Sequence, residues 1–547
     1  MWVFDKYLIL LSAAALLICS CGGKDDPTRP VKNHTAEGDG FTELVPQTQD
    51  IQLAADTIPD FSRVGYHYGD DSFPDYANVV QLPSPEEIGG DATEVIQSAI
   101  DNAPYGSVIQ FRPGRYVVDG LLIVDRDGII LRGAPDLGTE IFARGTVPIK
   151  DVPPTSDSSF FNCVRPLINI GVSKSERVVR TSLLLMSRTT IRNTDDVLIE
   201  DHSEPWRVAG LGLNSAFSIT EGEGSNIVED AFCGSSFVTV HDASAFSPGQ
   251  DVVVYRPGTQ KWIDDIQMSA EYLGEDGCWK PDAYSIRWER KVKAVVGNRI
   301  YFDIPLVMSV TSEYGGGVVR PCNARRVREC GVENLKLISD YNEDRNYIVN
   351  GREVKGDVYH AVSAIVFYGA EHCWVKDVET WYFSESAVAI AGGAKNISVQ
   401  DCCQQEPAGY VIGGLRYAFH ISAGQQSIVR NCESNFDRHQ FVTGPRVPGP
   451  NVFLYCEGKN AYADVGPHQR WATGTLYDHV ATNATIAARN TGLSGTGHGW
   501  QGTNQVFWSC SAGAGYDVQS PFVTGNNYWI DGGSVSLYES QRRKDGQ

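Results

Sequence analysis

Short runs in which apolar and polar residues alternate recur through the second half of the chain. After a longer first interval, successive runs begin roughly 23 to 31 residues apart. The clearest runs cover residues 331–335, 372–378, 396–402, 427–432, 451–456, 475–480, 505–510 and 528–531. Alternation with a period near two is typical of β-strands, and a repeat length in the twenties is typical of solenoids. The pattern therefore predicts a β-solenoid in which each repeat forms one rung of a stack.

Four of these runs end in a cysteine at the same position. These residues are Cys402, Cys432, Cys456 and Cys510. Stacked rungs would bring the four thiols into one interior column, where a thiol packs as a small apolar group. Although the chain contains 13 Cys, we expect a cysteine ladder in the core rather than disulfide bonds at these positions.

The N-terminal half begins with a helical pattern and then changes to strands. Residues 91–100 have the spacing of a capped amphipathic helix, and apolar strands follow at 108–111 and 128–133. A Gly-Asp-Ala-Thr helix start, a strand, Pro-Gly-Arg-Tyr at 113–116 and a Gly-Ile-Ile-Leu-Arg-Gly strand follow one another within residues 85–135. This order resembles the start of the right-handed β-helix proteins of the pectate lyase superfamily. The resemblance implies a right-handed parallel β-helix with an N-terminal capping helix, and activity on carbohydrate. Because that superfamily contains both polysaccharide lyases and glycoside hydrolases, the fold leaves the reaction open.

The rung pattern is interrupted in the middle of the chain. Apolar stretches at 237–240, 249–255 and 299–303 favour a small antiparallel β insertion, whose loop 260–265 could overhang the rungs and contact a glycan. We therefore predict an all-β chain of three parts: an N-terminal β-helix part at 56–234, an insertion at 235–320, and C-terminal β-helix rungs at 321–540.

Residues 1–21 have the features of a lipoprotein signal peptide. A short apolar run over residues 7–18, too short for a secure bilayer span, leads to Cys19-Ser20-Cys21. The ending resembles the lipobox of bacterial lipoproteins, which implies cleavage before Cys21 and acylation of its thiol. The polar segment 22–55 is then a flexible tether. We expect a lipid-anchored protein at the outer membrane or cell surface, with the periplasmic face or an ordinary cleaved signal peptide as alternatives.

Charge narrows the choice of ligand. The net charge of -21 argues against a nucleic-acid binder. Residues 410–475 nevertheless carry six Arg or Lys against four acidic residues, a local balance of +2, and three His besides. A basic patch on an acidic protein predicts an anionic ligand, and for a carbohydrate-active chain this is a uronate-containing polysaccharide.

Histidine and arginine recur on one face of these rungs when the rungs are aligned on Gly424, Gly444, Gly474 and Gly502. The alternation then directs six side chains outward: His420, Arg438, His468, Arg470, His498 and Trp500. Neighbouring strands lie about 4.8 Å apart, so a polymer could lie along such a strip.

A uronate lyase needs a cation on the carboxylate, a base for the C5 proton and an acid for the leaving oxygen. Arginine binds carboxylates bidentately, and His or Tyr exchanges a proton near neutral pH. We predict His468 as base or acid and Arg438 and Arg470 as carboxylate clamps. His439 is a further catalytic candidate, although its position favours the inward face. The predicted substrate-binding residues are His420, Tyr462, His498 and Trp500, the last by stacking on a sugar ring.

Two other functions stay open. An inverting glycoside hydrolase needs two carboxylates roughly 6.5–9.5 Å apart, for which the candidates are Asp437, Asp464 and Glu406. Residues 193–195 resemble one motif of the polygalacturonases and carry little weight alone. A non-catalytic surface protein that binds glycans is the third reading. No cofactor is predicted with certainty. A divalent cation such as calcium could bind the acidic loop that contains Asp340, Glu343, Asp344 and Asp357.

Overall fold

A computed structural model describes residues 57–530 except 121, 145–181, 187–218, 345, 350–351, 358–359, 362, 410 and 412–413. The predicted signal peptide, Cys21, the tether and residues 193–195 lie outside the described residues. No helix in the described part of the chain is long and apolar enough to cross a membrane.

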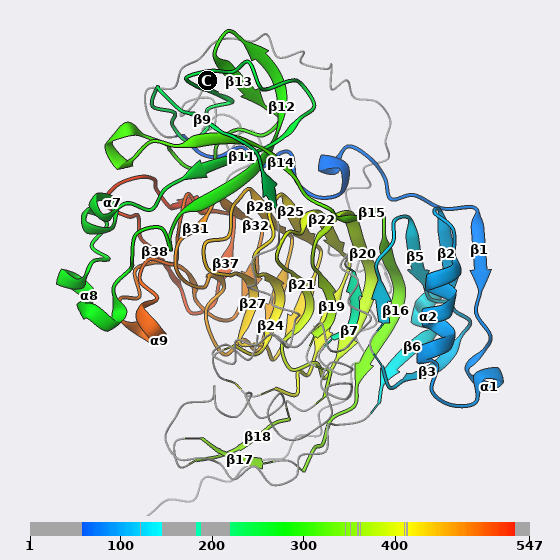
Figure 1. Ribbon diagram of the computed structural model, residues 1–547. Coiled ribbons are helices and arrows are strands. Elements are labelled where there is room, and N and C mark those ends of the chain that lie inside the picture. Colours follow the sequence, from blue (N-terminus) through cyan, green and yellow to red (C-terminus); the bar gives the residue numbers. More distant parts are fainter. Residues whose placement is uncertain are drawn as a thin grey trace, which may run out of the picture.

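Two parallel sheets run along the length of the molecule (Figure 1). The larger has 19 strands. Its main strands, in spatial order, are β1 (Asn78–Gln81), β2 (Ser107–Gln110), β5 (Ile129–Arg132), β16 (Gly331–Ser339), β20 (Ala370–Trp381), β22 (Lys395–Gln400), β25 (Ser427–Arg430), β28 (Asn451–Leu454), β32 (Thr475–Asp478), β36 (Val506–Trp508) and β39 (Tyr528–Ile530). The second sheet comprises β4 (Leu122–Val124), β7 (Ser182–Met186), β19 (Ser363–Phe367), β21 (Ser386–Ile390), β24 (Tyr417–Ile421), β27 (His439–Thr443) and β30 (Gly466–Pro467). The chain is therefore a right-handed parallel β-helix, as predicted.

A left-handed residue turns the corner between the main strand and a short strand in several rungs. Asp401 (φ 54°) separates β22 from β23 (Cys403–Gln405), and Asn431 (φ 51°) separates β25 from β26 (Glu433–Asn435). Asp and Asn adopt this conformation at lower cost than other non-glycine residues. The same corner continues through the short strands β29 (Glu457–Lys459), β33 (Ala481–Thr482) and β37 (Ser511–Ala512).

The cysteine ladder follows directly from this corner. Glu433 pairs with Cys403 on one side and Glu457 on the other, so the preceding Cys402, Cys432 and Cys456 stack in one column. All three are buried free thiols, and burial raises the pKa of Cys456 to about 12. The predicted ladder is confirmed for these three residues. Val480 occupies the next place in the column, before Cys510.

The N-terminal end of the stack is covered by the predicted helix, α2 (Thr93–Asn102), which lies beside β2 to β6 in Figure 1. Ile96 and Ile100 face the core and are fully buried. Asp91 Oδ1 accepts hydrogen bonds from the Thr93 amide at 3.0 Å and hydroxyl at 2.6 Å. Shorter elements complete this end: α1 (Pro85–Ile88), β3 (Gly114–Val118) and β6 (Thr139–Ala143).

The first described residues form a strap across the outside of the larger sheet. Ile58, Phe61 and Val64 pack against outward apolar side chains of three successive rungs: Val452 of β28, Leu476 of β32, and Val506 and Trp508 of β36. Farther along, Tyr66 packs on Trp374, with ring centroids 5.2 Å apart. The strap therefore keeps an apolar stripe of the β-helix away from water.

The insertion is an antiparallel sheet of seven strands: β8 (Thr220–Glu221), β9 (Ser225–Asn226), β10 (Phe237–Thr239), β11 (Asp251–Arg256), β12 (Ile286–Val296), β13 (Arg299–Phe302) and β14 (Val318–Asn323). Two of these strands precede residue 235, so the sheet begins earlier than the predicted boundary. The predicted loop 260–265 is a helix, α7 (Gln260–Asp265). Trp262 of this helix is fully buried, and its ring centroid lies 4.8 Å from that of Trp471 in the β-helix. This segment therefore packs on the rungs, and Trp262 is not accessible to a glycan.

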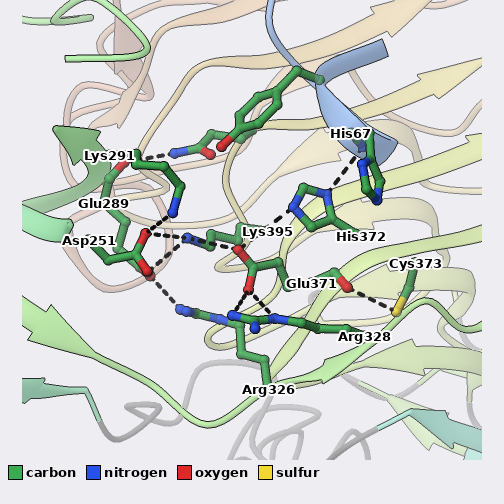
Figure 2. A network of polar contacts seen from close by, with 12 residues as sticks. His67, Asp251, Glu289, Lys291, Arg326, Arg328, Glu371, His372, Cys373 and Lys395 are labelled. Atoms are coloured by element: carbon green, nitrogen blue, oxygen red, sulfur yellow. Dashed lines mark hydrogen bonds and ion pairs between the residues drawn. The ribbon is translucent and has the colours of Figure 1, made fainter. Parts of the chain in front are cut away.

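A buried network of charges joins the insertion to the β-helix (Figure 2). Glu289 of β12 accepts a hydrogen bond from Arg326 at 2.6 Å and lies 3.6 Å from Lys395. Lys395 is in turn 3.1 Å from Glu371, which pairs with Arg328 at 2.7 Å. Each buried charge has a partner of opposite sign, which is the condition under which burial of charge is tolerated.

Replacing Glu289 by Gln is expected to lower the free energy of unfolding by about 3–5 kcal/mol, because Arg326 and Lys395 would stay buried without this counter-charge. Guanidinium unfolding followed by circular dichroism measures the loss. Glu275→Gln is the matched control, since the Glu275 side chain is 83% exposed. A loss for Glu289→Gln no larger than that of the control would show that the network does not hold the insertion in place.

Candidate functional site

Three side chains from successive rungs of the second sheet meet around one hydroxyl group. Tyr417 begins β24, Arg438 immediately precedes β27, and His468 immediately follows β30. The Tyr417 Oη lies 3.1 Å from His468 Nε2 and accepts a hydrogen bond from Arg438 at 3.3 Å. The Gly414 amide also donates to this oxygen at 3.3 Å. With two donors already on the oxygen, the hydroxyl proton is best directed to His468.

The ring of His439 packs against those of His468 and Tyr417. Its ring centroid is 4.5 Å from that of His468 and 5.1 Å from that of Tyr417. His439 Nδ1 is 2.7 Å from the carbonyl oxygen of Asp464, so Nδ1 carries the proton and Nε2 the lone pair. The Asp464 carboxylate is 3.4 Å from the same nitrogen and accepts a hydrogen bond from Gln501 at 3.1 Å. We call Tyr417, Arg438, His439, Asp464 and His468 the histidine cluster.

Burial keeps the imidazoles of the histidine cluster uncharged. Burial, followed by the charge of Arg438, lowers the pKa of His439 to about 3. Burial and the neighbouring His439 and Arg438 lower the pKa of His468 well below its usual value. Burial raises the pKa of Tyr417, although Arg438 opposes this shift. At neutral pH the cluster therefore contains two neutral imidazoles, a protonated tyrosine and a cationic guanidinium.

His498 extends the cluster by one further rung. Its ring centroid is 5.3 Å from that of His468, and the side chain is partly exposed. Burial and then Arg470 and Arg438 lower its pKa to about 4. His468, Arg438, Asp464, Arg470 and His498 are all partly exposed, whereas Tyr417 and His439 are buried. The exposed members therefore form the surface that a substrate would meet.

His420 lies next to this cluster with partners of its own. Its Nδ1 is 3.6 Å from Glu385 Oε1, and the other carboxylate oxygen of Glu385 accepts a hydrogen bond from Ser363 at 2.7 Å. The His420 ring contacts Tyr417 with centroids 5.0 Å apart. His420 is buried, so it supports the ring of Tyr417 from the side, and the predicted role in binding substrate gains no support.

The glycine alignment used to predict the strip is wrong. Gly502 pairs with Ala472, not with Gly474, and His420 pairs with Val442, whereas Arg438 lies one residue before β27. The loops between the two sheets differ in length from rung to rung, so glycines before the strands do not mark one column. His420 and Arg438 are thus not equivalent positions, although the side chains of the strip still converge.

Two predicted binding aromatics have contrasting positions. Trp500 is 3% exposed, packs in the interface with the insertion and donates from Nε1 to the carbonyl of Ile266 at 2.9 Å. Its predicted stacking on a sugar is therefore wrong, because the ring has no free face. Tyr462 is 54% exposed, and the guanidinium of Arg416 lies 5.7 Å from its ring centroid. The role of Tyr462 in binding a sugar ring stays a prediction.

The three predicted hydrolase carboxylates are not brought together. Asp437 is fully buried and accepts hydrogen bonds from Gln404 and Ser434, both at 2.7 Å. Burial raises its pKa to about 7. Glu406 is exposed on a corner. Burial raises the pKa of Tyr341 and Tyr382, and the charge of Glu406 adds to both shifts, so Glu406 lies near these two tyrosines and not in the histidine cluster. Only Asp464 lies in the histidine cluster.

A metal ion has no obvious set of ligands in the part of the chain that the structure describes. There, no three His, Cys, Asp or Glu side chains are arranged to hold a cation. Asp357 of the predicted acidic loop is buried and accepts a hydrogen bond from the Asn342 amide at 2.9 Å. This is a contact within the loop, so the predicted calcium site gains no support.

Sequence reasoning missed Tyr417 and Glu385. The alternation counted back from Gly424 assigns Tyr417 to the inward face, and Tyr417 is the first residue of β24, directly after Arg416 in the left-handed region (φ 58°). Tyr417 pairs with His439 across the sheet. A search for aromatic residues that begin a strand and pair with a His on the next strand would have found Tyr417. Such a search needs the correct register between the two strands.

Lowering the pH is expected to destabilise the protein through His439. The unfolded histidine has a pKa of about 6.5 and the folded one about 3, so below pH 6.5 only the unfolded state takes up this proton. The contribution to the free energy of unfolding is complete above pH 6.5 and falls by about 1.4 kcal/mol per pH unit below it. Relative to a His439→Gln variant, the wild type should lose about 2 kcal/mol between pH 7.5 and pH 5.0.

Urea unfolding at several pH values measures this difference. His479→Gln serves as control, because His479 is exposed and away from the cluster. Identical pH slopes for the wild type and His439→Gln would contradict a neutral, buried His439.

No protein-family model matches the chain, and no curated protein matches it. Among solved structures, it is similar to the Gp54 tailspike of Acinetobacter baumannii bacteriophage AP22, solved with A. baumannii capsular saccharide (TM-score 0.37, 13% identity, covering 82% of this chain and 56% of the tailspike chain). It is also similar to the tailspike protein gp49 from Pseudomonas phage LKA1 (TM-score 0.33, 11% identity, 81% and 69% covered). A third match is the alginate lyase from Paenibacillus sp. str. FPU-7 (TM-score 0.28, 8% identity, 83% and 99% covered). The chain thus spans little more than half of the Gp54 tailspike. Because these TM-scores lie below 0.5, the function proposed below depends on the side chains of the site alone.

Proposed function

We propose that this protein cleaves a uronate-containing polysaccharide by β-elimination, with the histidine cluster as its active site. The observation that carries the proposal is the hydroxyl of Tyr417, which lies 3.1 Å from a neutral imidazole and 3.3 Å from a guanidinium. A proton donor, a proton acceptor and a cation for the carboxylate are the three groups that this reaction needs.

Arg438 binds the carboxylate of the uronate residue to be cleaved. Arg438 is partly exposed and uses only NH1 in the bond to Tyr417, so further N–H groups are open to a substrate. Charge neutralisation of the carboxylate stabilises the anion that forms at C5, and preorganised charge at such a position is a large contribution to rate.

His468 and Tyr417 exchange the protons. His468, the partly exposed member of the pair, takes the C5 proton; the electrons of the C5–H bond form the C4–C5 double bond, and the C4–O bond breaks. The imidazolium returns a proton to the leaving glycosidic oxygen, so that no water is consumed. The buried Tyr417 exchanges a proton with His468 through their hydrogen bond and does not touch the substrate. His439, held in one tautomer by the Asp464 carbonyl, packs against His468 and fixes its ring.

The lipobox resemblance of residues 19–21 adds a location to the proposal. Acylated Cys21 would anchor the enzyme at the outer membrane or cell surface, and the segment 22–55 would separate it from the membrane. An extracellular, membrane-linked lyase meets polysaccharides that are too large to enter the cell.

The test is to incubate the protein lacking residues 1–21 with uronate-containing and neutral glycans, recording ultraviolet absorbance and reducing ends together. Absorbance that rises with the reducing ends, on uronate glycans only, is expected, since elimination creates an unsaturated uronate. A parallel reaction with EDTA shows whether a divalent cation such as calcium takes part. Reducing ends without absorbance would overturn the proposal in favour of hydrolysis, with Asp464 as the remaining carboxylate of the predicted set. Binding without any product would favour a glycan-binding protein.

A further inference from the structure

A buried carboxylate extends the histidine cluster by one rung. Glu385 immediately precedes β21, which pairs with β24, and the Glu385 carbonyl accepts a hydrogen bond from the Tyr417 amide at 2.7 Å. Glu385 therefore lies in the rung before Tyr417, whereas His439 lies in the rung after it. The side chain of Glu385 is 3% exposed, and it has no part in the proton transfers described above.

Two side chains face this carboxylate. Its Oε2 accepts a hydrogen bond from the Ser363 hydroxyl at 2.7 Å. Its Oε1 lies 3.6 Å from His420 Nδ1, and this nitrogen has no hydrogen-bond partner in the described part of the chain. Within the residues that the structure describes, His420 is the one side chain that forms an ion pair with Glu385. A buried carboxylate is stabilised by a proton on the group that faces it, so His420 Nδ1 carries a proton toward Glu385.

The buried carboxylates of Figure 2 have a different environment. Glu289 contacts both an arginine and a lysine at 2.6 and 3.6 Å, and Glu371 contacts a lysine and an arginine at 3.1 and 2.7 Å. These permanent charges join two parts of the fold. Glu385 instead faces one imidazole, and the ring of this imidazole contacts a member of the histidine cluster. Its position therefore affects the site more directly than it affects the joint between the insertion and the β-helix.

His420 connects Glu385 to Tyr417. The His420 and Tyr417 rings are perpendicular, with centroids 5.0 Å apart and planes at 89°. The Tyr417 ring also contacts His439, with centroids 5.1 Å apart. Two imidazoles thus hold the phenol ring, and one of them is held by Glu385. If His420 moved, the phenol ring could tilt, and a small displacement of its hydroxyl would break the 3.1 Å contact with His468.

We propose that Glu385 is a positioning residue that, through His420, holds the Tyr417 hydroxyl against His468. This inference rests on the proposed function, because the proton exchange between Tyr417 and His468 is a step of that function. Glu385 is buried and does not touch the substrate, so its loss should lower kcat and leave KM unchanged. A carboxylate that only supported the fold would lower stability and leave the kcat of the folded protein unchanged.

A double-mutant cycle tests the path from Glu385 to Tyr417. Glu385→Gln removes the charge at constant size and should lower kcat on a polyuronate about tenfold, because a hydroxyl that is slightly misplaced transfers protons poorly. KM should stay within about twofold of the wild-type value, since uniform binding of the substrate is not affected. In a His420→Gln background, Glu385→Gln should change kcat by less than about twofold, because the connecting ring is already gone.

Glu379→Gln is the matched control for the loss of a buried carboxylate. Glu379 is also buried, but it lies on β20 of the larger sheet and pairs with Lys336 at 3.2 Å. Its variant should keep the wild-type kcat. Circular dichroism at the assay temperature shows that each variant is folded before its rate is compared.

A crystal structure of Glu385→Gln gives a second readout that does not depend on activity. The distance between Tyr417 Oη and His468 Nε2 should exceed about 3.5 Å, beyond the range of a hydrogen bond. Four results would overturn the positioning role: an unchanged distance, an unchanged kcat, an equal loss of kcat in the His420→Gln background, or an equal loss for Glu379→Gln.

The positioning role and the proposed function fail separately. If the Tyr417 hydroxyl moves in Glu385→Gln while the wild type forms no unsaturated product, the positioning role stands and the lyase function falls. If the wild type forms the product and Glu385→Gln equals it in both kcat and the distance to His468, the positioning role alone falls.

Discussion

His468→Ala should lower kcat on a polyuronate about a thousandfold, the middle of the range for loss of a group that transfers protons. The reason is local: in the described site, Tyr417 has one imidazole to exchange a proton with, and this imidazole lies 3.1 Å away. Initial rates of ultraviolet absorbance at saturating substrate measure the effect. His468→Gln should be nearly as slow, because an amide keeps the shape and a hydrogen bond to Tyr417 but cannot take a proton.

The glutamine variant separates chemistry from positioning. If His468 only supported Tyr417, Gln would restore most of the activity, and that result would contradict its assignment as base or acid. The wild-type pH profile is a second check: because the pKa of His468 is lowered, the acidic limb of kcat/KM should lie below pH 6.5. His479→Ala, at an exposed position away from the cluster, should leave the rate unchanged.

Arg438→Ala should lower kcat/KM by about 10²–10³, the usual effect of removing one donor from a site of developing negative charge. Arg438→Lys should recover part of the loss, since lysine keeps the charge but cannot form paired hydrogen bonds with a carboxylate. Kinetics on the polyuronate and on its methyl ester measure both effects. The ester carries no charge, so the penalty for Arg438→Ala should be much smaller on it.

Arg430→Ala is the matched control for lost positive charge, and its kinetics should equal those of the wild type. An equal penalty for Arg438→Ala on the ester and on the free acid would contradict a carboxylate-binding role. Such a result would instead point to loss of the hydrogen bond from Arg438 to Tyr417.

Local patterns were sufficient to predict the fold. Strand alternation depends only on neighbouring residues, and it located the rungs and most of the insertion, whereas the helical spacing of residues 91–100 located α2. The column of Cys402, Cys432 and Cys456 was predictable because the left-handed corner just before each cysteine recurs at a constant position.

Predicting the site required the register of each strand against the strands of neighbouring rungs, which the sequence shows less directly. His468, Arg438 and His439 were predicted and do converge, because each lies at an end of a strand in the second sheet. The spacing of the glycines misaligned His420, since loop length varies between rungs. Trp500 was predicted as a surface residue because nothing in its own rung indicates that the insertion covers it.

The mass of the products tests the central claim most directly. A polyuronate hexasaccharide is incubated with the protein lacking residues 1–21, and the two fragments from each cleavage are weighed by mass spectrometry. Elimination predicts fragments whose masses sum to that of the substrate, and the same fragments should be nearly absent with His468→Gln. Fragments whose masses sum to the substrate plus one water would show hydrolysis and contradict β-elimination at the histidine cluster.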